Sequence, residues 1–294
     1  MIFSKKLLSW YNLNRRALPW RVTKDPYKIW ISEVILQQTK IEQGLPYYKK
    51  FIKKFPTVFT LAKANEDDVF KIWQGLGYYS RAQNLHHTAK KIVTDFKGNF
   101  PGSHNEMIKL KGIGDYTASA IGSVCFNNLE SVVDGNVYRF LGRYYGINIP
   151  INTSKAFNFY KSIGNKLISS EYPGDFNQAI MDFGSIQCKP VNPDCGSCIF
   201  SNNCYAFKNS QISSYPVKSK RNKIRTRYFN YLFFYNSKNQ TILNKRISKG
   251  IWHKLYEFPL IETKEILKEP NKEFLKIISN YTKKTSLNVN PFIS

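Results

Sequence analysis

The chain has 294 residues, 42% of them hydrophobic, which is enough to bury a core in one large domain or two smaller ones. Its 44 Lys and Arg residues outnumber the 20 Asp and Glu, for a formal net charge of +24. An AT-rich genome would enrich Lys, Asn and Ile, but it would not deplete the acids. The charge therefore favours a polyanionic partner, nucleic acid before a membrane surface.

No stretch of the sequence is apolar for long enough to form a secretory signal or a spanning helix. Lys5 and Lys6 interrupt the N-terminal segment, and the most apolar run, near Tyr228 to Tyr235, falls far short of the roughly 20 residues that a spanning helix needs. We therefore expect a cytoplasmic protein without a membrane partner. In such a reducing compartment the five cysteines would not form disulfides.

Apolar residues recur at helical spacing through most of residues 1–207, which predicts an all-α domain. Within it, the run IWISEVILQQTK, residues 29–40, places Glu33 among apolar side chains, and we expect Leu36 and Gln38 to lie on the same short helix as Glu33. Burial without a partner commonly raises the pKa of a carboxyl group until it is protonated near neutral pH, so Glu33 is a candidate proton donor. Alternatively, Glu33 lies on the polar stripe of an amphipathic helix, and the run by itself favours this interpretation.

The stretch LKGIGDYTASAIGSVCF, residues 110–126, predicts two helices joined by a glycine-containing hairpin. A short helix ends at Gly112, Ile113 packs inward, and a new helix begins after Gly114, near Tyr116. Glycines let backbone N–H groups and a helix N-terminus approach a phosphate, which grips DNA whatever its sequence. A plain turn between helices is the alternative.

The stretch VVDGNVYRFLGRYYG, residues 132–146, places Asp134 at or near the N-cap of a helix. Amide donors and the helix dipole would favour its ionised form, although an Asp there is more often only a structural cap. Together with Glu33 it gives one neutral and one ionised carboxyl group. That pair can break a glycosidic bond, because the acid protonates the leaving group and the carboxylate stabilises the oxocarbenium-like centre.

Four cysteines, Cys188, Cys195, Cys198 and Cys204, follow with the spacing C-x6-C-x2-C-x5-C. Four thiolates this close in sequence can wrap one metal centre. Zinc and an iron–sulfur cluster both accept four thiolates, so the spacing leaves the metal open.

Residues 208–225 are rich in cations and Ser, which predicts a basic linker. Beyond it, RYFNYLFFYNSKNQTILNKR offers two β-rich runs around a polar turn. We therefore expect a β-hairpin to open a second, smaller domain.

Taken together, these motifs resemble a known family. The cysteine spacing, the hairpin LKGIGDYTASAI and VVDGNV resemble the endonuclease III superfamily of helix-hairpin-helix DNA glycosylases, in which the cysteine loop binds a 4Fe-4S cluster. Within it, LPWR, SEVILQQT, GLGYYSRAQNLH, DGNV and FNQAIMDFGS resemble the MutY-type adenine DNA glycosylases. The segment GIWHKLYEFP is similar to the start of the Nudix-like C-terminal domain of that family.

The resemblance implies a specific domain organisation. Residues 1–207 would form an all-α helix-hairpin-helix glycosylase domain, with a six-helix subdomain at about 23–133 and an iron–sulfur cluster subdomain made of 1–22 plus 134–207. After the linker at 208–225, residues 226–294 would form a partial α+β Nudix-like domain. Because the sequence ends at Ser294, we expect this domain to be truncated before the family's 8-oxoguanine-reading loop.

The implied function is removal of adenine mispaired with 8-oxoguanine or guanine in double-stranded DNA, by a monomer associated with the nucleoid of a bacterial-type cytoplasm. Glu33 would protonate adenine at N7, and Asp134 would stabilise or trap the sugar cation before water attacks. Tyr116 would support Asp134, and Asn136 would orient the site. Tyr116 also stands where the bifunctional lyases of the superfamily have a nucleophilic Lys, which implies a monofunctional glycosylase.

The target adenine must be flipped out of the duplex into a pocket. By resemblance, Gln38 and Tyr78 enter the DNA helix, and further positions form the adenine pocket and the DNA contacts: Trp20, Arg21, Leu36, Gln37, Thr39, Gly112, Gly114 and Gln178. Trp20 and Leu36 would serve equally as core residues, and Gln178 as a helix-surface amide. Two positions depart from the family, since Gln178 replaces a Glu and Tyr138 stands where some members have a Lys linked with crosslinking to abasic DNA.

Two other hypotheses stay open. One is a pyrimidine or G:T-mismatch glycosylase on the same scaffold, which Glu33 and GIWHKLYEFP argue against. The other is a non-catalytic iron–sulfur DNA-binding protein, which the presence of both Glu33 and Asp134 disfavours.

Overall fold

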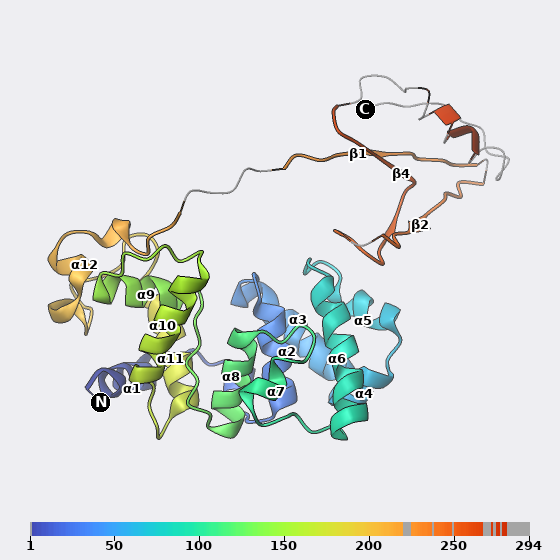
Figure 1. The fold of residues 1–294 in the computed structure, drawn as a ribbon. Helices are drawn as coiled ribbons and strands as arrows, with labels where there is room; N and C mark the ends of the chain where they lie inside the picture. Colours follow the sequence, from blue (N-terminus) through green and yellow to red (C-terminus); the bar gives the residue numbers. More distant parts are fainter. Residues whose placement is uncertain are drawn as a thin grey trace. The chain divides into compact units, whose positions relative to one another are not determined.

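Residues up to 219 form helices joined by short turns, as the periodicity predicts (Figure 1). The structure is a computed structural model that describes residues 2–219, 225–236, 238–248, 250–266, 272, 275–276 and 278–280. It divides into two compact units, Met1–Lys220 and Arg221–Ser294. Over these described residues, no helix combines the length and the apolar character needed to cross a membrane.

The helices of the first unit gather into two groups (Figure 1). One group contains α2 (Pro26–Leu36), α3 (Ile41–Lys54), α4 (Val58–Lys63), α5 (Glu66–Trp73), α6 (Ser80–Phe96), α7 (His104–Met107) and α8 (Asp115–Phe126). The other contains α1 (Ile2–Asn14), α9 (Gly135–Tyr145), α10 (Ser154–Leu167), α11 (Pro173–Ile186) and α12 (Tyr205–Lys208). Short 3-10 turns lie at Pro19–Arg21, Ser201–Asn203 and Ile212–Ser214. The N-terminal helix thus packs with the C-terminal half of the unit.

Buried aromatic and aliphatic side chains hold the second group of helices together. Its core draws on α1, α9, α10, α11 and the cysteine-containing loop, through residues that include Leu7, Trp10, Phe140, Leu141, Tyr160, Phe176, Phe183 and Phe200. Phe140 lies at the centre, because its ring centroid is 4.5 Å from that of Phe183 and 5.3 Å from that of Phe200. Removing this much apolar area from water is the main force that fixes the cysteine loop against α9 and α11.

Helix α2 carries Glu33 inside the other group. It begins at Pro26, where the Asp25 side chain accepts a hydrogen bond from the Tyr27 amide, and it ends at Leu36. Eight of its eleven residues are buried, including Glu33, so the helix has no solvated polar stripe. Gln38, predicted to share this helix, lies beyond its end in a left-handed conformation (φ +55°), because the chain turns there.

The predicted hairpin between α7 and α8 is confirmed. Gly112 has φ +82°, and a Cβ atom there would lie 2.7 Å from the Cβ of Asn84, so the turn requires glycine. Ile113 is buried, and Gly114 is the N-cap of α8. The Thr88 hydroxyl donates to the Lys111 carbonyl at 2.7 Å and thereby fastens the hairpin to α6.

The first part of the predicted linker at 208–225 packs on the helical unit instead. Tyr215 is buried, and its hydroxyl donates to Asn148 Oδ1 at 3.0 Å. The Ile151 amide donates to the Val217 carbonyl at 2.9 Å. The composition of the segment does not indicate this packing, because the packing depends on one buried aromatic side chain and on backbone hydrogen bonds.

The second unit contains short strands in its described residues. β1 (Tyr228–Tyr231) pairs antiparallel with β4 (Leu260–Thr263), and β2 (Asn244–Lys245) pairs antiparallel with β3 (Tyr256–Glu257). The predicted turn does form, since Tyr235 and Thr241 make an antiparallel bridge. The prediction that the flanking runs pair as one hairpin is wrong, because each run takes its main partner from later in the chain. From residue 267 onward, the predicted 226–294 domain lies largely outside the described residues.

Candidate active site

A cleft of about 960 Å³ in the helical unit gathers nearly all of the predicted catalytic and DNA-contacting residues. Its lining includes Trp20, Arg21, Glu33, Leu36, Gln37, Gln38, Thr39, Tyr78, Tyr116, Asp134, Asn136 and Gln178. Of the predicted set, Gly112 and Gly114 lie outside it, and Gly112 lines a smaller neighbouring cavity of about 180 Å³. Residues from six separate stretches of the sequence therefore meet at one surface.

Glu33 is buried in this cleft, with 6% of its surface exposed. Burial raises the pKa of its carboxyl group to about 7, a hydrogen bond with Tyr116 opposes this rise, and the negative charge of Asp134 adds to it. A carboxyl group with this pKa can hold its proton near neutral pH. Such a group can give a proton to a bound ligand.

The Tyr116 hydroxyl has two partners in the cleft. It lies 3.1 Å from Met181 Sδ, and it also hydrogen-bonds with the Glu33 carboxyl group. A thioether is a weak acceptor, so an ionised Glu33 carboxylate is the better acceptor for the hydroxyl proton. Burial raises the pKa of Tyr116 well above its usual range, so the phenol stays neutral.

Asp134 is the N-cap of α9, as predicted. Its Oδ1 accepts from the amides of Asn136 at 2.9 Å and Val137 at 2.8 Å, and its Oδ2 accepts from Asn136 Nδ2 at 2.8 Å. The expected net lowering of its pKa is wrong. Burial raises the pKa of Asp134 by more than the hydrogen bonds from Val137 and Asn136 lower it, because desolvation penalises the charge.

Arg139, which the sequence reasoning missed, connects Asp134 to the cysteine loop. Its Nη2 donates to Asn136 Oδ1 at 2.8 Å, and its Nε donates to the Cys188 carbonyl at 2.8 Å. It lies five residues after Asp134 on the first turns of α9. Arg139 therefore orients the Asn136 amide group, which faces Asp134, and it also holds Cys188 at the start of the cysteine loop.

A second missed residue, Asp182 on α11, holds Arg21, which lines the cleft. It is fully buried and pairs with both terminal nitrogens of Arg21, at 2.6 and 2.8 Å. Burial would raise the pKa of Asp182, but Arg21 and Arg16 together lower it below its usual range. Arg21 Nε also donates to Gln178 Oε1 at 3.1 Å, and Gln178 is itself buried, so the helix-surface interpretation of Gln178 is wrong.

Gln38 and Tyr78 lie at the mouth of the cleft, and both are exposed with positive φ angles of +55° and +45°. Such angles are uncommon for residues with side chains. Arg81 fixes both turns: its Nη1 donates to the Gln37 carbonyl at 2.7 Å and its Nη2 to the Gly77 carbonyl at 3.3 Å. A buried guanidinium at the C-terminal end of α2 also complements the helix dipole.

The four cysteines line one small cavity, together with Phe140, Phe183 and Phe200. Arg143, buried in α9, donates to the carbonyls of Lys189 and Pro190 at 2.7 and 3.1 Å and contacts Cys188 Sγ at 3.4 Å. In the part of the chain that the structure describes, no three His, Cys, Asp or Glu side chains are close enough to hold a single metal ion. Four thiols facing one cavity, with a cation beside them, nevertheless suit an anionic thiolate centre.

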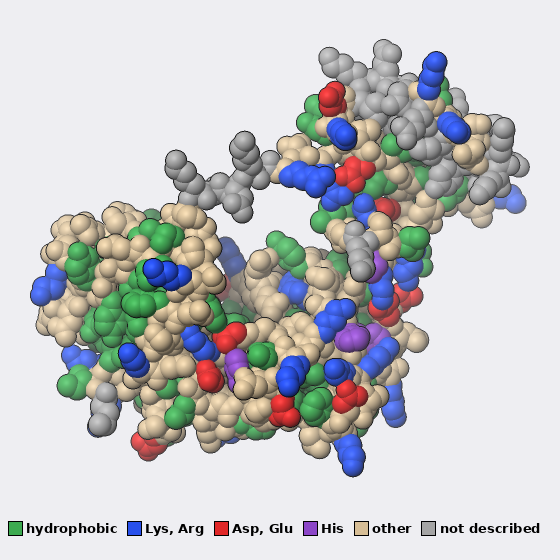
Figure 2. All heavy atoms as spheres, in the orientation of Figure 1, with side chains coloured by type: hydrophobic (Ala, Val, Ile, Leu, Met, Phe, Trp, Pro, Cys, Tyr) green, Lys and Arg blue, Asp and Glu red, His purple; other side chains and the backbone are tan. Residues whose placement is uncertain are grey.

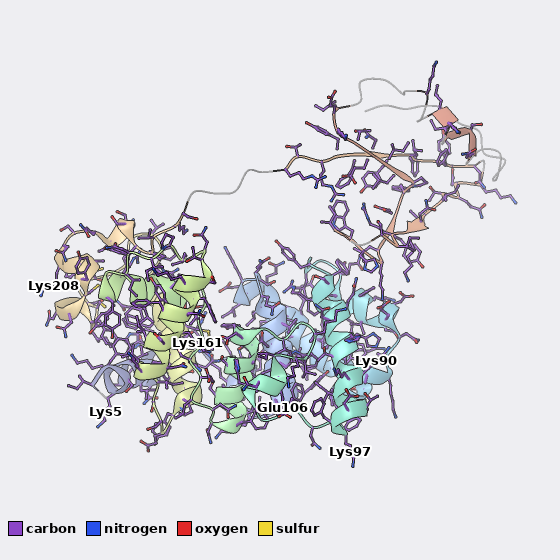
Figure 3. All side chains as sticks on the ribbon, viewed as in Figure 1. Lys5, Lys90, Lys97, Glu106, Lys161 and Lys208 are labelled. Atoms are coloured by element: carbon purple, nitrogen blue, oxygen red, sulfur yellow. The ribbon has the colours of Figure 1, made fainter. Side chains whose placement is uncertain are left out.

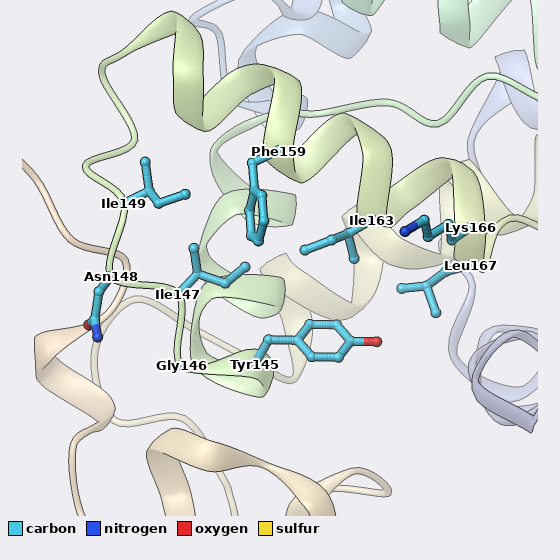
Figure 4. A pocket seen from close by; sticks show the side chains of 9 residues that line it. All are labelled: Tyr145, Gly146, Ile147, Asn148, Ile149, Phe159, Ile163, Lys166 and Leu167. Carbon is cyan, nitrogen blue, oxygen red and sulfur yellow. The ribbon is translucent and has the colours of Figure 1, made fainter.

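Other surface features lack this chemistry. A hollow of about 550 Å³ on α9 and α10 is lined by Tyr145, Gly146, Ile147, Asn148, Ile149, Phe159, Ile163, Lys166 and Leu167 (Figure 4). Figure 2 shows Lys and Arg scattered across the visible face of the helical unit, with hydrophobic side chains gathered over α9 and α10. Neither feature combines a proton donor with a carboxylate.

Comparisons with known proteins agree with this site. Residues 31–162 match the family model described as HhH-GPD superfamily base excision DNA repair protein. Among solved structures, that of a thermostable thymine-DNA glycosylase is 30% identical with a TM-score of 0.65, and the match covers 71% of this chain and 96% of the other. Fold and cleft thus define a helix-hairpin-helix DNA glycosylase.

Curated relatives identify the family within this class of glycosylases. The adenine DNA glycosylase of Buchnera aphidicola subsp. Baizongia pistaciae is 40% identical, with the match covering 94% of this chain and 79% of the relative. The adenine DNA glycosylase of Homo sapiens is 38% identical over 69% of this chain and 39% of the relative. The chain belongs to the adenine DNA glycosylase family.

Proposed function

We propose that this protein hydrolyses the N-glycosidic bond of adenine mispaired with 8-oxoguanine or guanine in duplex DNA, and leaves an abasic site. The observation that carries the proposal is that Glu33, with a pKa near 7, and the N-capped Asp134 line the same cleft. Unprotonated adenine is a poor leaving group, so its departure needs an acid at the base and an anion at the sugar.

Glu33 acts as the general acid in this mechanism. Its proton goes to N7 of the flipped adenine, and the Tyr116 hydroxyl donates to the carboxylate that remains. This hydrogen bond stabilises Glu33 in the charged form that the transfer produces. Burial disfavours that charged form before the transfer, which keeps Glu33 protonated and available as a donor near neutral pH.

Asp134 acts at the sugar. As the C–N bond breaks, positive charge develops at C1′, and the carboxylate oxygens stabilise it or trap it until water attacks. Three N–H groups, two of them from the backbone of α9, fix the Asp134 carboxylate without reorganisation. Tyr116 stands where the bifunctional lyases of the superfamily have a nucleophilic Lys, and a phenol cannot form a Schiff base, so the DNA strand stays intact.

Recognition uses the rest of the cleft and the hairpin. Gln38 and Tyr78 enter the duplex at the vacated position, supported by Arg81, while Arg21, Gln178, Trp20 and Leu36 surround the base. Gln37 and Thr39 contact the strand beside it. The hairpin glycines Gly112 and Gly114 bring backbone amides to a phosphate, and the net charge of +24 adds a salt-dependent attraction.

Cys188, Cys195, Cys198 and Cys204 hold a 4Fe-4S cluster in this proposal. The cavity that they line and the buried Arg143 beside them support it. When bound, such a cluster would cross-link the loop and provide a redox-active centre. Arg139 and Arg143 then keep the loop in place against α9.

The test is a single-turnover assay on duplexes containing 8-oxoguanine:A, G:A and G:T pairs. We expect adenine release from the first two, no thymine release, and strand cleavage only after alkali. Release of thymine alone would favour the mismatch-glycosylase alternative, and release of no base would overturn the proposal. Purified protein should also show broad absorbance near the blue end of the visible spectrum, whereas colourless protein containing zinc would contradict the cluster.

A further inference from the structure

Lys161 on α10 reaches from the second helix group to the first (Figure 3). Its Nζ donates to Asp115 Oδ2 at 3.1 Å, to Ser119 Oγ at 2.7 Å and to the Ser131 carbonyl at 2.7 Å. An ammonium group has three protons, and all three are used. Glu130 Oε2 adds an ion pair at 3.3 Å, and only 12% of the Lys161 side chain is exposed.

The acceptors belong to the segment that carries two proposed catalytic residues. Asp115 is the first residue of α8 and the direct neighbour of Tyr116. Ser131 lies in the loop that follows α8, three residues before Asp134. Lys161 therefore joins the two ends of this segment, one at Tyr116 and the other at Asp134.

The surrounding contacts distinguish Lys161 from its neighbours on α10. Asn165 Oδ1 accepts from the Ser131 amide at 2.8 Å, and a Cβ atom at Gly164 would lie 2.2 Å from Ser131 Oγ, so α10 already lies against the loop. Of Lys161, Gly164 and Asn165, only Lys161 also contacts α8. It does not line the cleft, so any effect on the reaction must pass through the residues that it holds.

The charges indicate that this contact is strong. Asp115 is shared between Lys161 and His104, whose Nε2 lies 3.0 Å from Asp115 Oδ1. Asp115 and Glu130 are about one-third exposed, so loss of Lys161 would leave two carboxylates close together, with only His104 still beside Asp115. They would then repel each other, and the α8 end of the segment would separate from the Ser131 end.

We propose that Lys161 is a positioning residue that sets Tyr116 at its working distance from Asp134. The inference rests on the proposed function, because it assigns those two residues to the reaction. A misplacement of about 1 Å in a catalytic group can cost about 100-fold in rate. Lys161 thus acts on the chemical step and leaves the DNA-binding surface unchanged.

The experiment compares Lys161→Met with Lys166→Met, a matched change on the same helix away from the cleft. At saturating enzyme, the single-turnover rate of adenine release should fall about 10- to 100-fold in Lys161→Met and by less than about twofold in Lys166→Met. The affinity for the duplex should stay close to that of wild type in both variants. Lys161→Arg, which keeps the charge, should recover most of the rate. Rates are normalised to the folded fraction measured by circular dichroism at the assay temperature.

Two milder variants, Asp115→Asn and Ser119→Ala, keep the test decisive if Lys161→Met does not fold. Each should lower the rate several-fold, and combining Asp115→Asn with Lys161→Met should cost less than the sum of the two changes. If the wild type is active, either of two results would overturn this inference alone. One is that Lys161→Met is as fast as Lys166→Met, and the other is that both milder variants react at the wild-type rate. An inactive wild type would instead overturn the proposed function.

Discussion

The two sides of the cleft place a carboxyl group in opposite surroundings. On α2, Glu33 sits in the middle of an apolar helix, where a tyrosine hydroxyl opposes the effect of burial on its pKa. On α9, Asp134 sits at a helix N-terminus and accepts three hydrogen bonds from Asn136 and Val137. Both groups are desolvated, yet only Asp134 has backbone donors to stabilise its charge.

In the proposed mechanism, this difference lets one cleft contain both an acid, Glu33, and an anion, Asp134. Burial alone would neutralise both carboxyl groups, and their mutual repulsion would reinforce the effect. The helix N-terminus breaks the symmetry, because its amide groups are fixed and need no reorganisation when the charge is present. The following predictions test whether the two surroundings have separate consequences.

The largest effect is expected for Asp134→Asn. Its amide oxygen can still accept from the Asn136 and Val137 amides, so the cap and the fold should survive. Loss of the negative charge at the sugar should lower the single-turnover rate about 10⁴-fold, or about 5.5 kcal/mol in barrier height. The exposed Asp175→Asn is the control. A rate within tenfold of wild type would remove Asp134 from the mechanism.

Next in size is Glu33→Gln, which removes the proton but keeps the shape. We expect about a 10³-fold loss in the rate of adenine release with duplex binding largely unchanged. In the wild type, the rate should fall as pH rises through about 7, because Glu33 then loses its proton. The residual activity of the variant should lack this alkaline decline. A decline of the same shape in both proteins would assign it to another group.

The same substitution should stabilise the fold at alkaline pH. Native Glu33 keeps its proton up to about pH 7, whereas the unfolded chain loses it near pH 4.5, so wild-type stability decreases as pH rises between these values. The full loss is about 3 kcal/mol, and Glu33→Gln avoids it. Urea unfolding at pH 5 and pH 8 should show an advantage for the variant that grows with pH. Glu171→Gln, an exposed control, should show no such trend.

The smallest effect is expected for Asn136→Ala, which removes one of the three donors to Asp134 together with the link to Arg139. We expect about a tenfold lower rate, or about 1.4 kcal/mol, which is close to the lower end of what a hydrogen bond to a charged group contributes. The acidic limb of the pH–rate profile should also move to higher pH, because the Asp134 carboxylate is less stabilised. Asn158→Ala, on the exposed face of α10, is the control, and an unmoved acidic limb would contradict this role.

Much of this site could be predicted from local patterns. The N-cap at Asp134 and the hairpin at Gly112 each depend on a few neighbouring residues, and short-range sterics and hydrogen bonding enforce them. The burial of Glu33 does not, because its own run favours a polar stripe and only tertiary packing removes the side chain from water. The family motifs then selected positions that line one cleft. The prediction for Gln38 is wrong because α2 ends at Leu36. The prediction for the first part of the linker is wrong because buried Tyr215 packs that segment on the helical unit.

The sequence by itself determined the helical class and the family, and it predicted the two carboxyl groups that are proposed to act, because these follow from residue type, order and spacing. The tertiary structure alone revealed what surrounds them: Asp182 beneath Arg21, Arg139 between Asn136 and Cys188, and Lys161 between α8 and the loop before Asp134. These partners are separated by tens of residues or more, so only packing brings them within hydrogen-bonding distance. Packing also decided the pKa direction of Asp134, since desolvation depends on all the atoms that exclude water from it.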